Sequence, residues 1–333
     1  MTVVGNSHRR PELVPAAATG GVREFHAALP GYAPTPLRQL DENVWLKDES
    51  DRFGLPAFKI LGASWAVERT VRERPGTRVL VAASAGNHGR AVARVAALRG
   101  LASRIYLPAA ASAGRARLIA GEGAEVVRVD GDYDAAVAHA EREAGEPGAA
   151  LVADTAAVPS GGPPEWVIDG YSTLFAEIDE QLAAPVGLVL VPAGVGSFTA
   201  AAVRWAVQQH PGAAVIAVEP AMAACVAASL AAGAITTVPT PGTRMAGMDC
   251  ATPSATAWPT LRHGLTGAVA VTDAEARQVM RELAALGIVA GDCGAATVAA
   301  LRRLPARQRA GSVVCVSTEG ASDPDGYADA LAG

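Results

Sequence analysis

The sequence predicts an α/β fold built on open parallel sheets, and three observations support this. From Val44 onward, apolar runs of strand length alternate with segments of helical periodicity, which is the pattern of an α/β protein. The strand-like runs, such as 188–191, are continuously apolar, which is typical of parallel strands covered by helices on both faces. The length of 333 residues, half of them hydrophobic, suffices for about two domains with large cores.

The elements follow in chain order and are separated by turn residues. Residues 1–30 are mixed and punctuated by Pro and Gly, and we expect them to wrap a surface. Strands are expected at 44–47, 78–83, 104–107, 125–129, 150–153, 188–191, 214–218 and 312–316. Helices are expected at 58–74, 88–99, 115–120, 134–144, 166–184, 198–209, 221–232, 273–286 and 295–304. Pro75 and Gly76 end the first helix, Gly100 ends the second, and 157–164 should form a loop.

Composition and charge argue against several classes of protein. The formal charge is −5, from 28 basic and 33 acidic residues, and aromatic residues make up 5%, so neither a basic stripe nor a stacking platform for nucleic acid is expected. The four cysteines form no Cys-x-x-Cys pair, which argues against a metal site and a disulfide framework. The N-terminus lacks an apolar signal segment, and the longest apolar run, 221–235, is too short to span a bilayer. We therefore expect a soluble, cytoplasmic protein that binds neither nucleic acid nor membranes.

The first candidate site is the loop that carries Lys59. This residue stands at the start of a predicted helix, flanked by Phe58 and Ile60. Apolar neighbours and the positive end of a helix would lower the pKa of its amine. An amine with a lowered pKa is a competent nucleophile toward an aldehyde and a competent general base. By itself, however, Lys59 is better explained as a surface lysine at a helix start.

Two loops of small residues, each between a strand and a helix, are candidate anion sites. Residues 83–90 would expose backbone N–H groups to a carboxylate or phosphate, although Asn87 or His88 could simply cap the helix. In 191–199, Gly194 and Gly196 permit close approach to a phosphate, and Ser197 adds a hydroxyl. The second loop is neither a Walker loop nor a complete dinucleotide motif, because no Gly-Lys-Ser/Thr follows and position 199 is Thr.

One lysine and two anion loops together indicate a ligand with an aldehyde, a phosphate and a carboxylate. Pyridoxal 5'-phosphate carrying an amino-acid substrate has all three groups. The three loops resemble those of the fold-type II pyridoxal-phosphate enzymes, the superfamily of the tryptophan synthase β-subunit. Within it, the segments 47–59, 154–156, 245–249, 290–296 and 317–324 are similar to diaminopropionate ammonia-lyase. The matches occur in order from about Pro34 to Tyr327, nearly the whole chain.

The resemblance implies the architecture of the chain and the residues that hold the cofactor. A large cofactor-binding domain would comprise 1–79 and 179–333, a small mobile domain 80–178, and the protein would be a homodimer. Lys59 would bind the cofactor aldehyde and shuttle the Cα proton, and Asn87 would hydrogen-bond the 3′-oxygen. Ser317 or Thr318 would face the pyridine nitrogen. The phosphate would be held by the backbone of Gly194, Val195, Gly196 and Ser197.

Substrate binding is implied for a second set of residues. The substrate carboxylate would lie against Ser84, Ala85, Gly86 and His88. Independently of the resemblance, Asp249 beside Cys250 is a candidate for the pocket lining, although a polar loop residue explains it equally well. In diaminopropionate ammonia-lyases an Asp precedes the Gly-Asn-His and is thought to act on the D-isomer, but this chain has Ala85 there. The second acid of the family is retained as Asp154. We therefore hypothesise that only L-substrates react.

The implied reaction is α,β-elimination on an L-amino acid with a β-leaving group, similar to 2,3-diaminopropionate, through an aminoacrylate to pyruvate and ammonia. Asp154 could bind or protonate an amino leaving group. A β-replacement synthase that uses the same aminoacrylate and a serine or threonine dehydratase are the alternatives. A nicotinamide-dependent oxidoreductase is disfavoured because the third glycine of its motif is missing. A binding protein without catalysis is disfavoured because Lys59 is retained.

Overall fold

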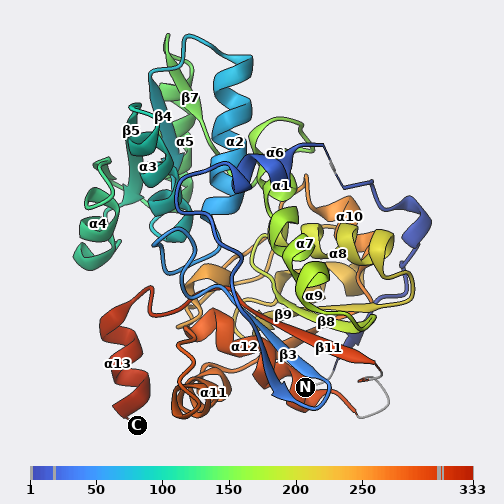
Figure 1. Cartoon of the computed structure of the whole chain (residues 1–333). Helices are drawn as coiled ribbons and strands as arrows, with labels where there is room; N and C mark the ends of the chain where they lie inside the picture. The colour runs from blue at the N-terminus through green and yellow to red at the C-terminus, as the bar shows by residue number, and fades with distance from the viewer. Residues whose placement is uncertain (1–2, 18–19, 306–308, 310, 333) are drawn as a thin grey trace.

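The chain forms two α/β units, each built around its own sheet (Figure 1). The computed structural model describes residues 3–17, 20–305, 309 and 311–332. Within those residues, a seven-stranded sheet has the order β1-β10-β9-β8-β11-β3-β2 and a four-stranded sheet has the order β6-β5-β4-β7. The predicted α/β fold class with open parallel sheets is confirmed.

The large sheet is parallel in its interior and antiparallel at both edges. The parallel strands are β3 (Val44–Asp48), β8 (Val186–Pro192), β9 (Ala214–Pro220), β10 (Gly267–Val271) and β11 (Ser312–Ser317). The edge strands β1 (Val4–Gly5) and β2 (Leu37–Asp41) run antiparallel to β10 and β3. Neither edge strand was predicted, because β1 has two residues and β2 is half exposed and polar, and the interior strand β10 was missed as well.

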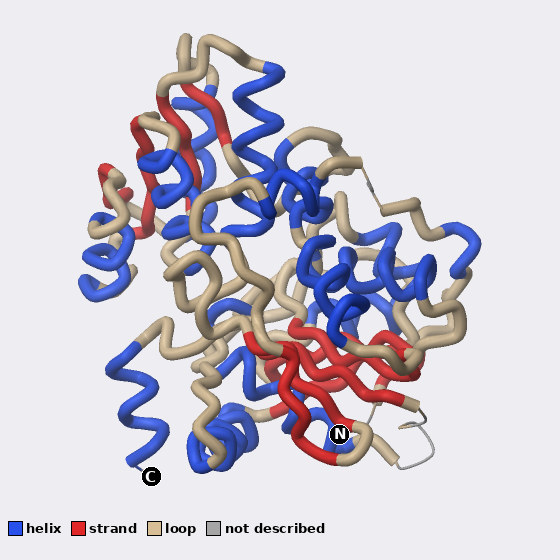
Figure 2. The backbone as a smooth tube through the Cα atoms, in the orientation of Figure 1, coloured by secondary structure: helices blue, strands red, loops and turns tan. Residues whose placement is uncertain are grey.

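The small sheet is parallel throughout, and its strands lie in sequence between β3 and β8 of the large sheet. Its strands are β4 (Val79–Ala83), β5 (Ala102–Pro108), β6 (Glu125–Val129) and β7 (Ala149–Leu151). All four were predicted within two residues at their starts. Figure 2 shows this sheet and the large sheet as two separate groups of strands with helices between them.

Successive residues of the central strands point into two different cores. Leu188 and Leu190 of β8 pack in the core with α11 (Asp273–Ala285) and α12 (Asp292–Arg303). Val189 and Val191 pack in the core with α7 (Ser172–Gln181), α8 (Ser197–Gln209) and α10 (Trp258–Gly264). Because both faces exclude water, these strands are continuously apolar rather than alternating, which is the pattern that predicted them.

The predicted helix 166–184 is in fact two helices that break at Tyr171. The remaining helices are α1 (Val22–Ala27), α2 (Ile60–Glu73), α3 (Asn87–Leu98), α4 (Ala113–Ala120), α5 (Tyr133–Ala144), α6 (Pro163–Gly170), α9 (Cys225–Ala232) and α13 (Pro324–Ala332). A Cβ on Gly62 would lie 2.7 Å from the Tyr171 ring, and one on Gly170 would lie 2.6 Å from the Leu61 carbonyl oxygen. The close packing of α2 against α6 therefore requires glycine at both positions. The short helices α1, α10 and α13 were not predicted.

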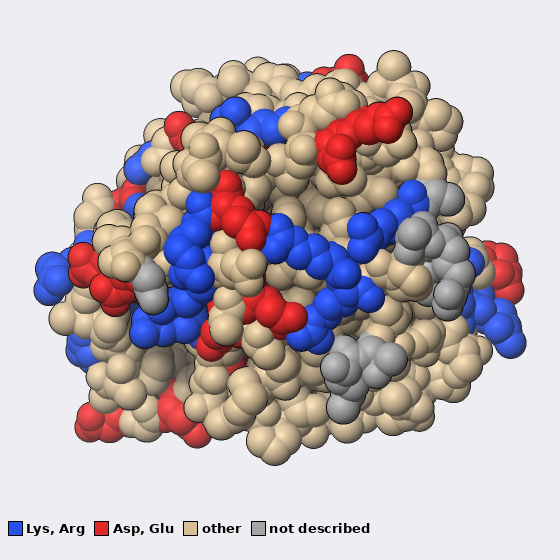
Figure 3. Space-filling model, turned by 90° about the horizontal axis from the view of Figure 1, so that it is seen from below, with Lys and Arg blue, Asp and Glu red and all other residues tan. Residues whose placement is uncertain are grey.

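Charged side chains of both signs share the face of the molecule drawn in Figure 3. Basic and acidic residues are interleaved there rather than separated into patches of one sign. On α11 and α12, Arg302 pairs with Glu282 and Arg303 pairs with Glu275. In the part of the chain that the structure describes, no helix is both long enough and apolar enough to cross a membrane.

Candidate active site

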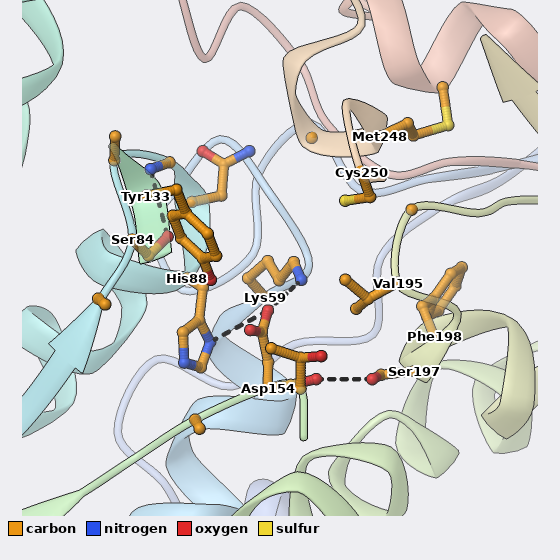
Figure 4. Close-up of a pocket in the computed structure, with 18 of the residues that line it drawn as sticks. Lys59, Ser84, His88, Tyr133, Asp154, Val195, Ser197, Phe198, Met248 and Cys250 are labelled. Carbon is orange, nitrogen blue, oxygen red and sulfur yellow. Dashed lines mark hydrogen bonds and ion pairs between the residues drawn. The ribbon is translucent and has the colours of Figure 1, made fainter. Parts of the chain in front are cut away.

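Loops at the carboxyl ends of both sheets line one open cavity of about 1500 Å³. The loops that follow β3, β4, β7, β8 and β11 all contribute to its lining. The three loops singled out in the sequence therefore meet, as expected for ligand sites at the carboxyl ends of parallel strands. Figure 4 shows Lys59 pointing into this space, with Asp154 on one side and Val195 on the other.

Lys59 forms an ion pair with Asp154 at the centre of the site. Lys59 is the N-cap residue of α2, as predicted, and its Nζ donates to Asp154 Oδ2 over 2.8 Å. The side chains are 20% and 16% exposed, so a small molecule in the cavity can reach both. Their positions in sequence are 95 residues apart, and the pairing itself was not predicted.

The pKa of the Lys59 amine moves in the direction opposite to the one predicted. Burial is the largest single influence and alone would lower this pKa, but the Asp154 carboxylate, together with Tyr171 and Cys250, raises it above the usual range. Burial likewise works to raise the pKa of Asp154, while His88 and Lys59 lower it below its usual range. The prediction rested on the apolar neighbours alone, so in the protein without a ligand it was wrong.

The first turn of α3 is held by tertiary contacts rather than by a side-chain cap. Gly86 is the N-cap residue and its helix start has no side-chain cap, which removes the alternative that Asn87 or His88 caps the helix. Asn87 Nδ2 donates to Glu319 Oε2 over 2.7 Å. His88 Nε2 lies 2.8 Å from the carbonyl oxygen of Val152, and its buried Nδ1 has no hydrogen-bond partner among the described residues.

The loop before α8 has the geometry of an anion site. Gly196 takes a φ of 92°, which a residue with a side chain rarely adopts, and a Cβ on Gly194 would lie 2.9 Å from the Gly247 carbonyl oxygen. The loop therefore requires both glycines. Ser197 begins α8, and its hydroxyl donates to the backbone oxygen of Asp154 over 2.7 Å. This bond ties the anion loop to the loop that carries the acid.

The structure brings most of the predicted site residues together. Those that line the cavity are Lys59, Ser84, Ala85, Gly86, Asn87, His88, Asp154, Gly194, Val195, Gly196, Ser197, Asp249 and Thr318. Ser317 is fully buried outside the lining, so of the two hydroxyls considered only Thr318 faces the cavity. Asp249 is an exposed residue at the rim, where partial burial disfavours its charge and raises its pKa.

Several residues of the site were missed. Tyr133, the first residue of α5, points toward Asp154 and His88 from above, and Cys250 lies on the opposite wall (Figure 4). Burial raises the pKa of the Cys250 thiol to about 12, so it is uncharged. Glu319 lines the cavity next to Thr318. For Tyr133 the sequence gives no signal beyond an aromatic residue at a helix start, whereas Glu319 stands inside a motif already singled out.

The whole sequence contains only two lysines, Lys47 and Lys59. Lys47 is fully buried and bound by three oxygen acceptors, so it cannot reach a ligand. Any covalent bond between an aldehyde and a lysine amine of the folded protein must therefore form at Lys59.

These residues fit pyridoxal phosphate. The cavity offers an amine, a glycine-rich helix start for a phosphate, and a second helix start at α3 for a carboxylate. His88 Nδ1 is a buried polar atom beside the same space that lies 3.8 Å from Asp154 Oδ2 and has no hydrogen-bond partner among the described residues. Among the described residues, no group of three or more His, Cys, Asp or Glu is placed to hold a metal ion.

Comparisons with known proteins agree with this chemistry. The family described as pyridoxal-phosphate dependent enzyme matches residues 28–319. A diaminopropionate ammonia-lyase of Salmonella typhimurium is 34% identical, over 92% of this chain and 90% of that protein. The Escherichia coli diaminopropionate ammonia-lyase, solved in complex with an aminoacrylate-PLP azomethine reaction intermediate, superposes with a TM-score of 0.91 at 30% identity, covering 99% of this chain and 96% of that one. Threonine deaminase isoform 2 of Solanum lycopersicum, at 21% identity and a TM-score of 0.82, shares the fold.

Proposed function

The chain belongs to the family of pyridoxal-phosphate dependent enzymes, and we propose that it is a lyase that acts on 2,3-diaminopropionate or a similar L-amino acid. The reaction is α,β-elimination, which gives pyruvate and ammonia. The observation that carries this proposal is the Lys59 amine, held against the Asp154 carboxylate between two helix starts that suit anions. The similarity to diaminopropionate ammonia-lyases over nine-tenths of the chain supports the substrate class.

Each part of the cofactor has a residue in the cavity that suits it. Lys59 would hold its aldehyde, the backbone from Gly194 to Ser197 its phosphate, Asn87 its 3′-oxygen and Thr318 its ring nitrogen. When bound, the cofactor supplies an electron sink for the charge left at Cα. A neutral hydroxyl from Thr318 leaves the ring nitrogen unprotonated, which favours elimination over transamination.

The chain's own groups then bind the substrate and move its protons. The start of α3, residues 84–88, offers backbone N–H groups to the substrate carboxylate. Lys59 is the base that takes the proton from Cα. Asp154 stands beside Lys59 and attracts a positively charged amino group at the β-position, and it can direct a proton to that group as it leaves. The buried walls on either side limit the entry of water.

Ala85 limits the reaction to one face of the substrate. It lines the cavity at the position where the family has an acid for the D-isomer, and a methyl group cannot take a proton. We expect L-2,3-diaminopropionate to react and the D-isomer to react at least about 100-fold more slowly, the scale of losing a general base. Comparable rates for the two isomers would refute this restriction.

The test of the proposed function is a product assay on the purified protein loaded with pyridoxal phosphate. We expect pyruvate to form in equal amount to the L-2,3-diaminopropionate consumed, with both nitrogens of the substrate released as ammonia. The same assay with added thiols or amines detects β-replacement, in which pyruvate falls as a new amino acid forms. Serine and threonine as substrates test the dehydratase alternative. A protein that binds the cofactor but releases no pyruvate from any of these substrates would overturn the proposal.

Three properties of the whole protein belong to the proposal as well. The small domain, 80–178, is proposed to close on the large domain, 1–79 and 179–333, when substrate binds. The four free cysteines, Cys225, Cys250, Cys293 and Cys315, are consistent with a cytoplasmic location. We propose a homodimer because homodimers are common in this superfamily. Sedimentation analysis of the protein with bound pyridoxal phosphate tests this proposal.

A further inference from the structure

We propose that Glu319 is a positioning residue that orients Asn87 toward the cofactor and thereby couples cofactor binding to the docking of the two α/β units. This inference rests on the proposed function, in which Asn87 holds the 3′-oxygen of the cofactor. Glu319 follows β11 of the large sheet, whereas Asn87 begins α3 beside the small sheet, 232 residues away in sequence.

The backbone of Glu319 is fixed to the loop that carries the catalytic lysine. Ala57 and Glu319 form an antiparallel bridge, and the Phe58 N–H donates to the carbonyl oxygen of Thr318 over 3.2 Å. On the other side, the Gly291 N–H donates to the Glu319 carbonyl oxygen over 2.9 Å at the start of α12. The backbone contacts with the large unit therefore fix the position of Glu319 independently of its side chain.

The Glu319 carboxylate uses this fixed position to hold the Asn87 amide. Its Oε2 accepts from Asn87 Nδ2 over 2.7 Å and from the Ser322 hydroxyl over 2.8 Å. The residue is 8% exposed, so water competes poorly for these bonds. A hydrogen bond to a buried carboxylate is stronger than one between neutral groups.

One N–H of the Asn87 amide donates a hydrogen bond to Glu319, and this bond fixes the orientation of the amide plane. The second N–H on the same nitrogen is free for a ligand in the cavity that Asn87 lines. Without Glu319, the amide could rotate, and a ligand would have to order it on binding. The bond also joins the two units, so it favours the arrangement in which Asn87 and Lys59 face the same cavity.

The experiment is a double-mutant cycle. For each protein, absorbance titration of the cofactor-free form gives the dissociation constant of pyridoxal phosphate. The proteins are the unmodified chain, Glu319→Ala, Asn87→Ala and the double variant. We expect Glu319→Ala to weaken binding by about tenfold to a hundredfold. We expect Asn87→Ala to weaken it at least as much, and the double variant to bind like Asn87→Ala alone.

Two further variants separate positioning from general damage to the fold. Glu319→Gln retains an oxygen that can accept from Asn87, and we expect it to recover most of the affinity. Ser322→Ala removes the other hydrogen bond to Oε2 and leaves the bond to Asn87, so we expect its affinity to change less than threefold. If Glu319→Ala weakens binding equally with and without Asn87, or leaves it unchanged, the inference is overturned. If the unmodified chain does not bind pyridoxal phosphate, the proposed function itself fails.

Discussion

The two lysines of this chain lie in opposite surroundings. Lys47 is fully buried, and its three N–H groups meet Glu177 Oε2 at 2.7 Å, the Thr35 carbonyl oxygen at 2.7 Å and Gln181 Oε1 at 3.1 Å. Lys59 is 20% exposed and has one carboxylate partner, Asp154, on the wall of a cavity. Lys47 has no hydrogen bond left to offer a ligand, whereas Lys59 has.

The electrostatic surroundings of the two amines differ in the same way. Burial lowers the pKa of Lys47 despite the attraction of Glu177 and Glu49, whereas Asp154 raises the pKa of Lys59. Lys47 belongs to a closed network in which Arg52 pairs with both Glu49 and Glu177, so two cations balance two anions. Burial of a charge therefore does not identify a catalytic residue. What distinguishes Lys59 from Lys47 is an incomplete set of partners beside a cavity.

The largest expected effect is on catalysis. Lys59→Arg keeps the charge but removes the amine that we propose bonds to the aldehyde and moves the Cα proton, so we expect activity to fall by at least about 1000-fold. Pyruvate formation under substrate saturation measures this loss. Borohydride reduction of the loaded protein, followed by peptide mapping, should place the cofactor on the Lys59 peptide and leave the Lys47 peptide unmodified. Cofactor found on Lys47 would contradict the contrast between the two lysines.

For stability, in contrast to activity, we expect substitution of Lys47 to have a larger effect than substitution of Lys59. Lys47→Met leaves Glu177 and Glu49 with Arg52 as their only buried cation, and breaking a buried ion pair in this way costs about 3–5 kcal/mol in the free energy of unfolding. Lys59→Met leaves an Asp154 that solvent can reach, so we expect a loss below about 1 kcal/mol. Urea unfolding of both variants without cofactor gives the two values. Similar losses would show that the Lys59–Asp154 pair is also a structural element.

The third effect concerns the pKa of Lys59. In Asp154→Asn the attraction that raises this pKa is removed while burial, which lowers it, remains, so the pKa must fall. A larger fraction of the amine is then uncharged at a given pH, because a lower pKa releases the proton more readily. At pH 8 we expect acylation of Lys59 in the cofactor-free variant to be at least about tenfold faster, as read by mass spectrometry. Lys47 is the internal control and should stay unlabelled in both proteins. An unchanged or slower rate at Lys59 would show that Asp154 does not control its charge.

The sequence could predict what depends on neighbours along the chain. The alternation of apolar runs predicted all four strands of the small sheet and four of the five interior strands of the large sheet, but not β10, and small residues after β4 and β8 predicted the loops that line the cavity. Lys59 was found because its motif is local and resembles a known family. Pairings across the chain, such as Lys59 with Asp154 or Asn87 with Glu319, depend on how the two units dock. For that reason the direction of the shift in the Lys59 pKa was predicted wrongly. For the same reason Glu319 was not predicted as a site residue, although it lies within the motif 317–324.

The smallest expected effect tests whether Lys47 needs all three of its acceptors. Gln181 lies at an exposed position at the end of α7, and Gln181→Leu removes the longest of the three bonds to Lys47 together with the bond from Gln181 Nε2 to the Thr35 carbonyl oxygen. Water can reach this side of the network and replace the lost acceptor, so we expect the free energy of unfolding to fall by about 1 kcal/mol. Because Gln181 does not line the cavity, kcat should be unchanged. Urea unfolding and the pyruvate assay measure the two quantities. A loss as large as that of Lys47→Met would mean that the network is stable only when all three acceptors of Lys47 are present.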